Sequence, residues 1–141
     1  MNFSELANLS IERAGASLRK GEMSPLELTD AYLARIEQLN PLINAYITVT
    51  AERAREDARR ATEELAAGKV RGPLHGIPIA HKDLYETAGI RTTGGAKIHA
   101  DHIPRDDCTV AARLRAAGTI LLGKLNTHEY AYGVTTDNPH F

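Results

Sequence analysis

The chain has 141 residues, of which 43% are hydrophobic and 25% are charged, and its 17 basic and 18 acidic side chains leave a net charge of −1. These values predict a soluble globular protein with a hydrophobic core, and they argue against direct contact with nucleic acid or a membrane. One cysteine, Cys108, excludes an internal disulfide, and residues 1–5 lack the basic head and apolar stretch of a signal peptide. We therefore expect a cytoplasmic protein.

The first 68 residues are expected to be mainly helical. A helix is predicted over residues 10–20, although Gly15 in its middle disfavours it. The next helix has a clear start, because Ser24-Pro25-Leu26-Glu27 combines an N-cap serine, a proline at the first helical position and the glutamate of a capping box. Apolar residues then recur at helical spacing until Asn40-Pro41, where we expect the helix to stop.

A short strand is expected at residues 45–49, followed by a long helix at residues 51–67. Thr50 is placed to cap this helix, and Gly68 is placed to close it. Because the helix is polar around most of its circumference, we expect it to lie on the surface.

From residue 69 onward the pattern predicts alternating strands and helices. The apolar run 77–80 predicts a buried strand, and the proline within it fits an edge strand or the first residues of a strand. A helix capped by Asp106 or Asp107 and ending at Gly118 leads to a second strand at residues 119–122. A strand, a helix and a strand in this order predict two parallel strands joined by a right-handed crossover.

Together these elements predict an α/β fold in which N-terminal helices pack on a mixed, partly parallel sheet. Residues 1–68 would form a mainly helical region and residues 69–141 an α/β segment, both within one domain (residues 1–141). The tail at residues 133–141 is rich in turn-forming residues, and it adds no further strand to a sheet that has few. We therefore expect the chain to be the N-terminal part of a longer domain.

Two lysines are the main candidates for chemistry, because each follows a predicted strand. Lys82 comes after the first strand of the α/β segment and Lys124 after the second. In open α/β sheets, catalytic and binding groups collect at the carboxyl ends of the strands. Burial there lowers the pKa of a lysine and favours the neutral amine, which is a base. Position alone does not separate Lys82 from Lys124, and a packed stem with a solvated amine would explain either.

Collinear motifs over almost the whole chain distinguish the two lysines. The segment around Lys82 has the sequence GPLHGIPIAHKDL, and similar motifs follow it in order: TTGG at residues 92–95, DCTVAARL at 107–114, GTILLGKLNTHEY at 118–130 and NPHF at 138–141. In these motifs and in its helical opening, the sequence resembles the amidase signature family. The resemblance implies a three-layer α/β/α fold, of which this chain would be an incomplete part.

The resemblance also implies a catalytic triad of serine, a second serine in a cis peptide, and lysine. In this triad Lys82 would be the base. It would take a proton through the bridging serine and so activate the other serine to attack an amide carbonyl. The two family serines belong to a Gly/Ser-rich segment beyond the NPHF motif, and no GGSS sequence occurs in these 141 residues. Ser4, Ser10, Ser17 and Ser24 all precede residue 25, in the helical region. We therefore expect this chain by itself not to hydrolyse amides.

Three other readings of the motifs are weaker. Residues 118–125 match the phosphate-binding pattern GxxxxGK, but a leucine follows the lysine and a strand is predicted in place of the loop. The histidines lack a third ligand at matching spacing, so we expect no metal site and no cofactor. Cys108 has no conspicuous histidine partner in the sequence, and we interpret it as a small packed residue.

Two residues near the lysines are secondary candidates. Asp83 is placed to orient Lys82 or a neighbouring backbone amide. Asn126 follows the Lys124 strand and could bind a substrate at the same edge, although asparagine more often ties down a turn.

The resemblance predicts an amidase that hydrolyses a small-molecule carboxylic amide. It extends nearly as well to the glutamine-hydrolysing subunit of the Asp/Glu-tRNA amidotransferase, which would imply partner subunits. His128-Glu129 and the NPHF motif favour the free amidase, for which a homodimer is possible. A short non-catalytic protein that binds a partner stays open as a third alternative.

Overall fold

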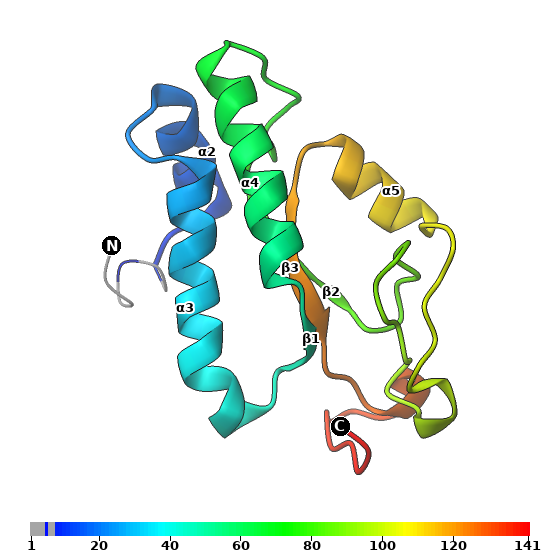
Figure 1. Cartoon of the computed structure of the whole chain (residues 1–141). Helices are drawn as coiled ribbons and strands as arrows, with labels where there is room; N and C mark the ends of the chain where they lie inside the picture. Colours follow the sequence, from blue (N-terminus) through cyan, green and yellow to red (C-terminus); the bar gives the residue numbers. More distant parts are fainter. Residues whose placement is uncertain (1–4, 6–7) are drawn as a thin grey trace.

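The computed structural model describes residue 5 and residues 8–141 (Figure 1). Residues 1–4, on which the signal-peptide argument mainly rests and which include Ser4, lie outside the described part. The helices and strands are, in chain order, α2 (Ile11–Lys20), α3 (Pro25–Ile43), β1 (Tyr46–Val49), α4 (Ala51–Ala66), β2 (Pro78–Lys82), η1 (Lys97–His99), α5 (Thr109–Ala116), β3 (Ile120–Leu125) and η2 (Glu129–Ala131). Within the described residues, no helix combines the length and the apolar character needed to cross a bilayer.

The sheet has three strands in the order β1-β3-β2. The central strand β3 is parallel to β2 and antiparallel to β1, which confirms the predicted mixed sheet and the predicted parallel pair. β2 begins at Pro78 and is an outer strand of the described sheet, as the proline indicated. In Figure 1, α3 and α4 lie side by side on one side of β3, and α5 lies on the other side. The N-terminal helices therefore cover the sheet as expected.

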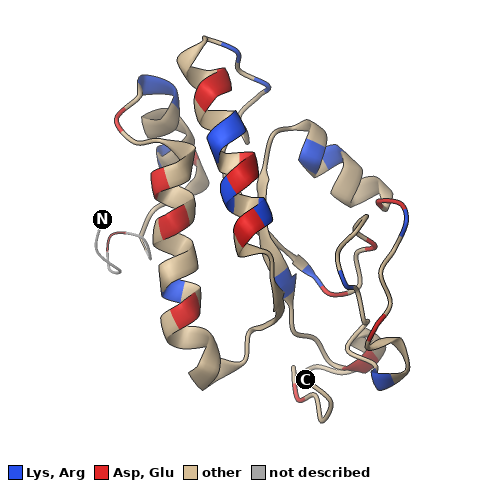
Figure 2. Cartoon of the chain, viewed as in Figure 1, with Lys and Arg blue, Asp and Glu red and all other residues tan. Residues whose placement is uncertain are grey.

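Small side chains allow α4 to pack closely on the sheet. Ala54 and Ala58 are completely buried, and they join Ile120 and Leu122 of β3 and Leu33 of α3 in one hydrophobic cluster. Charged residues occupy much of the rest of α4, and Figure 2 shows acidic and basic residues along both α3 and α4. The helix is therefore a surface helix, as predicted, but one that buries a stripe of alanines.

Gly15 has a packing role in α2. A Cβ at this position would lie 3.2 Å from the carbonyl oxygen of Pro73, which is tighter than ordinary contact. Gly15 disfavours the helix by its propensity, but its lack of a side chain lets the segment after α4 lie close to α2. Ser10 caps the helix by accepting a hydrogen bond from the Arg13 amide at 3.2 Å.

The predicted capping box of α3 is confirmed, but the predicted end of the helix is wrong. The helix continues through Pro41 to Ile43 and ends at Asn44, which has left-handed backbone angles. Pro41 lies in the last turn, so few intrahelical hydrogen bonds follow it. Asn40 joins this last turn to β1: its side chain accepts from the Tyr46 amide at 2.7 Å and donates to the Tyr46 carbonyl at 3.1 Å.

The predicted cap of α5 is also wrong. The N-cap residue is Cys108, and no side chain caps this helix; neither Asp106 nor Asp107 occupies the position. The Asp107 carboxylate is engaged elsewhere, because it accepts a hydrogen bond from the Ala88 amide at 2.8 Å and pairs with Arg115 at 2.7 Å. Long-range partners therefore override the local capping preference.

Thr50 occupies the N-cap position of α4, as predicted, but its side chain does not cap the helix. The hydroxyl donates instead to the carbonyl of Leu121 at 2.8 Å, and the Thr50 amide donates to the carbonyl of Leu122 at 2.9 Å. Thr50 thus joins the start of α4 to the central strand.

An irregularity in β3 places Lys124. The pairing with β2 runs from Ile79↔Leu121 to His81↔Lys124, so β3 has one residue more than β2 over this stretch. Gly123 lies within it, and a Cβ there would be 2.2 Å from the carbonyl oxygen of Thr48 in β1. Only glycine lets the two backbones approach in this way, and Lys124 is thereby paired with His81 at the carboxyl edge of the sheet.

Candidate active site

The two lysines lie on neighbouring parallel strands at the same edge of the sheet, as predicted. Lys82 is the last residue of β2 and pairs with Leu125, while Lys124 in β3 pairs with His81. Their surroundings differ sharply, however. The Lys82 side chain is exposed and makes no hydrogen bond or ion pair with another described residue, whereas Lys124 is completely buried.

Three oxygen atoms surround the amine of Lys124. Its Nζ donates to the Tyr85 carbonyl at 2.8 Å and to the Thr92 hydroxyl at 2.5 Å, and lies 3.4 Å from Oδ1 of Asp83. Burial lowers the pKa of Lys124 below that of an ordinary lysine, while the Asp83 carboxylate opposes this shift. Lys124 is therefore a buried group with a close acidic partner, not a lysine whose amine reaches solvent.

Asp83 is also completely buried, and its other carboxylate oxygen binds the glycine-containing loop at residues 92–95. Oδ2 accepts hydrogen bonds from the amide of Thr93 at 2.8 Å and from its hydroxyl at 2.5 Å. The backbone contributes as well, because the Gly94 amide donates to the Asp83 carbonyl at 2.8 Å. The carboxylate therefore binds Lys124 and Thr93, and it does not orient the amine of Lys82 directly.

Thr92 and Thr93 were not predicted as site residues, because the sequence identified their segment only as part of a motif. Both are almost fully buried although both are polar. The sequence signal for them is two hydroxyl residues directly before two glycines, in a segment that follows Asp83. Gly94 and Gly95 both have positive φ angles, at 64° and 69°, so they allow the tight turn that brings the two threonines to Asp83.

Asn126 lies at the carboxyl end of β3 but has a structural role. Its side-chain amide donates to the Asn44 carbonyl at 3.1 Å, and its side-chain oxygen accepts from the Thr127 amide at 2.8 Å. The Asn126 amide also donates to the Ala45 carbonyl at 2.7 Å. The residue therefore ties the end of α3 to the segment after β3, which is the role that the sequence favoured.

Two buried histidines lead to a prediction for the pH dependence of stability. Burial is the main cause that lowers the pKa of both His75 and His81. Lys124 and Arg115 lower the pKa of His81 further, while Asp107 opposes them. In the unfolded chain a histidine titrates near about 6.5, so below this pH the unfolded state binds more protons than the native state. The free energy of unfolding is therefore expected to fall as the pH drops from about 6.5 through the lowered native pKa values.

Urea unfolding of the complete protein between about pH 5 and 8, in constant ionic strength, checks this prediction. The His81→Asn variant should show a smaller loss of stability on acidification, since one of the two groups is removed. An unfolding free energy that is constant across this range would contradict it.

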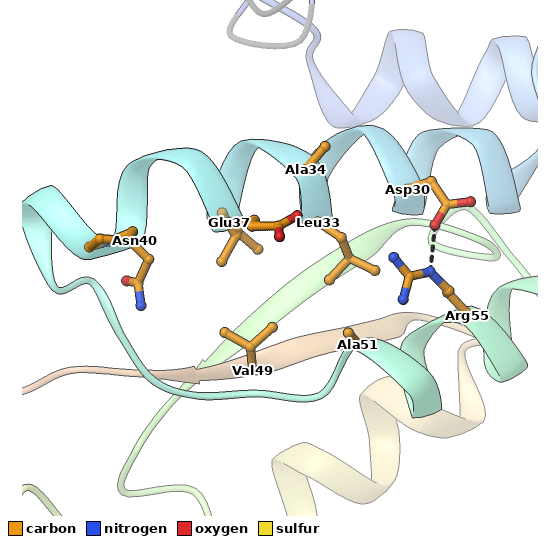
Figure 3. A pocket seen from close by; sticks show the side chains of 10 residues that line it. Asp30, Leu33, Ala34, Glu37, Asn40, Val49, Ala51 and Arg55 are labelled. Atoms are coloured by element: carbon orange, nitrogen blue, oxygen red, sulfur yellow. Dashed lines mark hydrogen bonds and ion pairs between the residues drawn. The ribbon is translucent and has the colours of Figure 1, made fainter.

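A pocket of about 620 Å³ lies away from the lysines, between α3, β1 and the start of α4 (Figure 3). Leu33, Val49 and Ala51 form part of its apolar wall, and Asp30 at its rim accepts a hydrogen bond from Arg55 at 2.8 Å. Neither Lys82 nor Lys124 is among the residues that line it.

The segment that matches the phosphate-binding pattern forms β3, so its backbone groups are used in the sheet, as expected. Among the described residues, no group of three or more His, Cys, Asp or Glu side chains is arranged to hold a metal ion. The ring centroids of His99 and His102 lie 6.0 Å apart with the rings tilted by 59°, and His102 contacts Glu86 at 3.2 Å.

The chain thus has a mixed α/β fold with two lysines and a buried carboxylate at the carboxyl edge of parallel strands, the edge at which open α/β sheets bind ligands. Comparison with known proteins makes this more specific. The family model "Amidase" matches residues 27–141. The chain belongs to the amidase family.

Its relatives include a glutamyl-tRNA(Gln) amidotransferase subunit of Geotalea daltonii, which is 44% identical over 137 residues, or 97% of this chain and 28% of that protein. The corresponding subunit of Rhodospirillum rubrum is 48% identical over 132 residues, or 94% of this chain and 26% of that protein. Among solved structures, the native peptide amidase of Stenotrophomonas maltophilia superposes with a TM-score of 0.84 at 36% identity, covering 89% of this chain and 26% of that one. The chain therefore spans between a quarter and a third of the length of these relatives.

Proposed function

We propose that these residues supply the catalytic base of an amidase that hydrolyses a carboxylic amide, and that Lys82 is this base. The observation that carries the proposal is the position of Lys82. It ends β2 at the carboxyl edge of the sheet, in a chain of the amidase family, and its side chain is free of protein partners within the described residues. An amine in this position is accessible to a serine hydroxyl brought by another segment.

In this mechanism the amine of Lys82 accepts a proton through a bridging serine, and a second serine attacks the amide carbonyl. A serine hydroxyl is a weak nucleophile without such a base. Backbone N–H groups then stabilise the oxyanion, ammonia or an amine leaves, and water releases the acyl group. The three described serines serve other purposes: Ser10 and Ser24 cap helices, and Ser17 donates to Glu22 at 2.9 Å. The reacting serines are therefore proposed to lie in a segment outside these residues.

A second candidate is the glutamine-hydrolysing subunit of a tRNA-dependent amidotransferase. It is favoured by the identity of 44% and 48% to two curated subunits of such enzymes. In that case the ammonia would pass to a partner subunit, so the protein would work in a complex. The free amidase would act alone or as a homodimer. Both candidates use Lys82 in the same role, and a cytoplasmic location fits both.

Assays of the complete protein distinguish the candidates. The purified protein is tested for ammonia release from glutamine and from a series of simple linear primary amides, alone and together with any subunits that co-purify from its source. A free amidase should turn over one of the simple amides without partners. The amidotransferase component should hydrolyse glutamine best in its complex and in the presence of the acylated tRNA. Absence of amide hydrolysis under every condition would contradict both candidates.

A further inference from the structure

Lys124 and Asp83 form a completely buried pair at the carboxyl edge of the sheet. Two opposite charges taken out of water cost free energy, and replacement of a buried ion pair by apolar side chains is often neutral or stabilising. The 3.4 Å between Nζ and Oδ1 is also longer than a strong charge-assisted hydrogen bond. A contribution to stability alone is therefore a weak explanation for this pair. Asp83 directly follows Lys82 in the chain, which points to another role.

The pair joins three separate segments of the chain. Lys124 lies in β3, Asp83 directly follows β2, and their remaining hydrogen bonds include those to Thr92 and Thr93 of the loop at residues 92–95. Each polar side chain in this network is almost fully buried. Buried charges with such directed partners hold segments in one arrangement, because any other arrangement would leave a charge unpaired.

Hydrogen bonds connect this network directly to the backbone of Lys82. The Lys82 carbonyl accepts from the Tyr85 amide at 3.0 Å, and the Tyr85 carbonyl in turn accepts from Nζ of Lys124 at 2.8 Å. On the other side, the Asp83 amide donates to the Leu125 carbonyl at 3.1 Å, which extends the pairing of β2 and β3 beyond Lys82. The backbone that bears the exposed Lys82 side chain is therefore held both by the sheet and by the buried pair.

We propose that Lys124 and Asp83, through Thr92 and Thr93, are positioning residues that hold Lys82 at the geometry required for proton transfer. This inference rests on the proposed role of Lys82 as the base. The network does not touch the reacting atoms: it sets the direction of the Lys82 side chain relative to the serines. Misplacement of a catalytic group by about 1 Å lowers rates on the order of 100-fold, so a loosened network should lower kcat more than it raises KM.

The threonines provide the test, because changes to Lys124 or Asp83 themselves are expected to disturb the fold most. In the complete enzyme, Thr93→Val removes the hydroxyl that donates to Asp83 and keeps the side-chain volume, while Thr93→Ser keeps the hydroxyl. We expect Thr93→Val to lower kcat by at least about tenfold with KM changed less than about threefold, and we expect Thr93→Ser to restore most of kcat. Rates are measured per active site, after titration with a covalent inhibitor, so that unfolded protein does not count.

Thr119→Val is the matched control. Thr119 is also buried, its hydroxyl donates to the Leu114 carbonyl at 2.9 Å, and it lies just before the amino end of β3, far along the strand from Lys82. It should lower thermal stability as much as Thr93→Val does but leave kcat per active site unchanged.

The outcomes separate this inference from the proposed function. If Lys82→Ala retains activity, Lys82 is not the base and both proposals fail. If Lys82→Ala is inactive while Thr93→Val has a normal kcat per active site, or while Thr93→Ser is as impaired as Thr93→Val, only the positioning role is overturned. Equal loss of kcat in Thr93→Val and Thr119→Val would also overturn it, since a general loss of stability would then explain both.

Discussion

Replacement of Lys82 by alanine in the complete protein is expected to lower kcat for amide hydrolysis by a factor of roughly 10² to 10⁴, the usual contribution of a general base. The side chain is exposed and has no described partner, so its loss should change the free energy of unfolding by less than about 0.5 kcal/mol. The measurement is steady-state kinetics on the amide that the wild-type protein turns over best, with urea unfolding of the same samples.

Two further variants make this test specific. Lys82→Arg keeps a positive charge and a long side chain, but a guanidinium stays protonated and cannot act as a base. It should therefore be as inactive as Lys82→Ala. Lys69→Ala removes another exposed lysine, in the loop after α4, and should leave kcat unchanged. An active Lys82→Arg variant would show that the position needs a cation and not a base.

The second large effect is expected for stability. Lys124→Ala leaves the buried Asp83 carboxylate without its partner, and removal of one member of a buried ion pair costs about 3–5 kcal/mol. The Thr92 hydroxyl also loses the donor on Lys124, and the Tyr85 carbonyl keeps only the hydrogen bond from the Thr87 hydroxyl. Chemical denaturation of the complete protein measures this loss, which would exceed that of Lys82→Ala several-fold.

A double-mutant cycle tests whether the loss comes from the pair. In the Asp83→Asn/Lys124→Met variant neither buried charge remains, so its destabilisation should be clearly smaller than the sum for the single variants Asp83→Asn and Lys124→Met. Simple additivity would mean that Lys124 and Asp83 do not stabilise each other. A loss below about 1 kcal/mol in Lys124→Ala would mean that the amine reaches water in solution.

The sequence predicted those parts of the fold that depend on neighbouring residues. The capping box at Ser24, the positions of the strands and the glycines that close helices are local signals, and each appears close to its expected place. Three local predictions failed for long-range reasons. The Asn40 side chain holds the turn around Pro41 by bonding Tyr46, the Asp107 carboxylate binds Ala88 and Arg115, and the Thr50 hydroxyl bonds Leu121. None of these partners can be predicted from neighbouring residues.

The same distinction applies to the candidate site. Sequence position brought both lysines to one edge of the sheet, but it did not reveal that Lys124 is buried and Lys82 exposed. That difference arises because residues 92–95 fold back over Lys124, a contact between segments about 30 residues apart in the chain. The resemblance to a family assigned the two lysines different roles, and the structure shows that their physical surroundings differ as well.

The strand order β1-β3-β2 has a consequence for how the chain folds. The strand that joins the other two is the last of the three to be synthesised, so neither β1 nor β2 has a partner until residue 125 is available. At ordinary rates of translation, roughly 4 to 15 s separate the end of β1 from the end of β3. During this time α3 and α4 can pair with each other but cover no sheet. The helical region is therefore expected to exist on the ribosome as a helical hairpin with an exposed alanine stripe, and to become a cooperative unit only when β3 enters between the earlier strands.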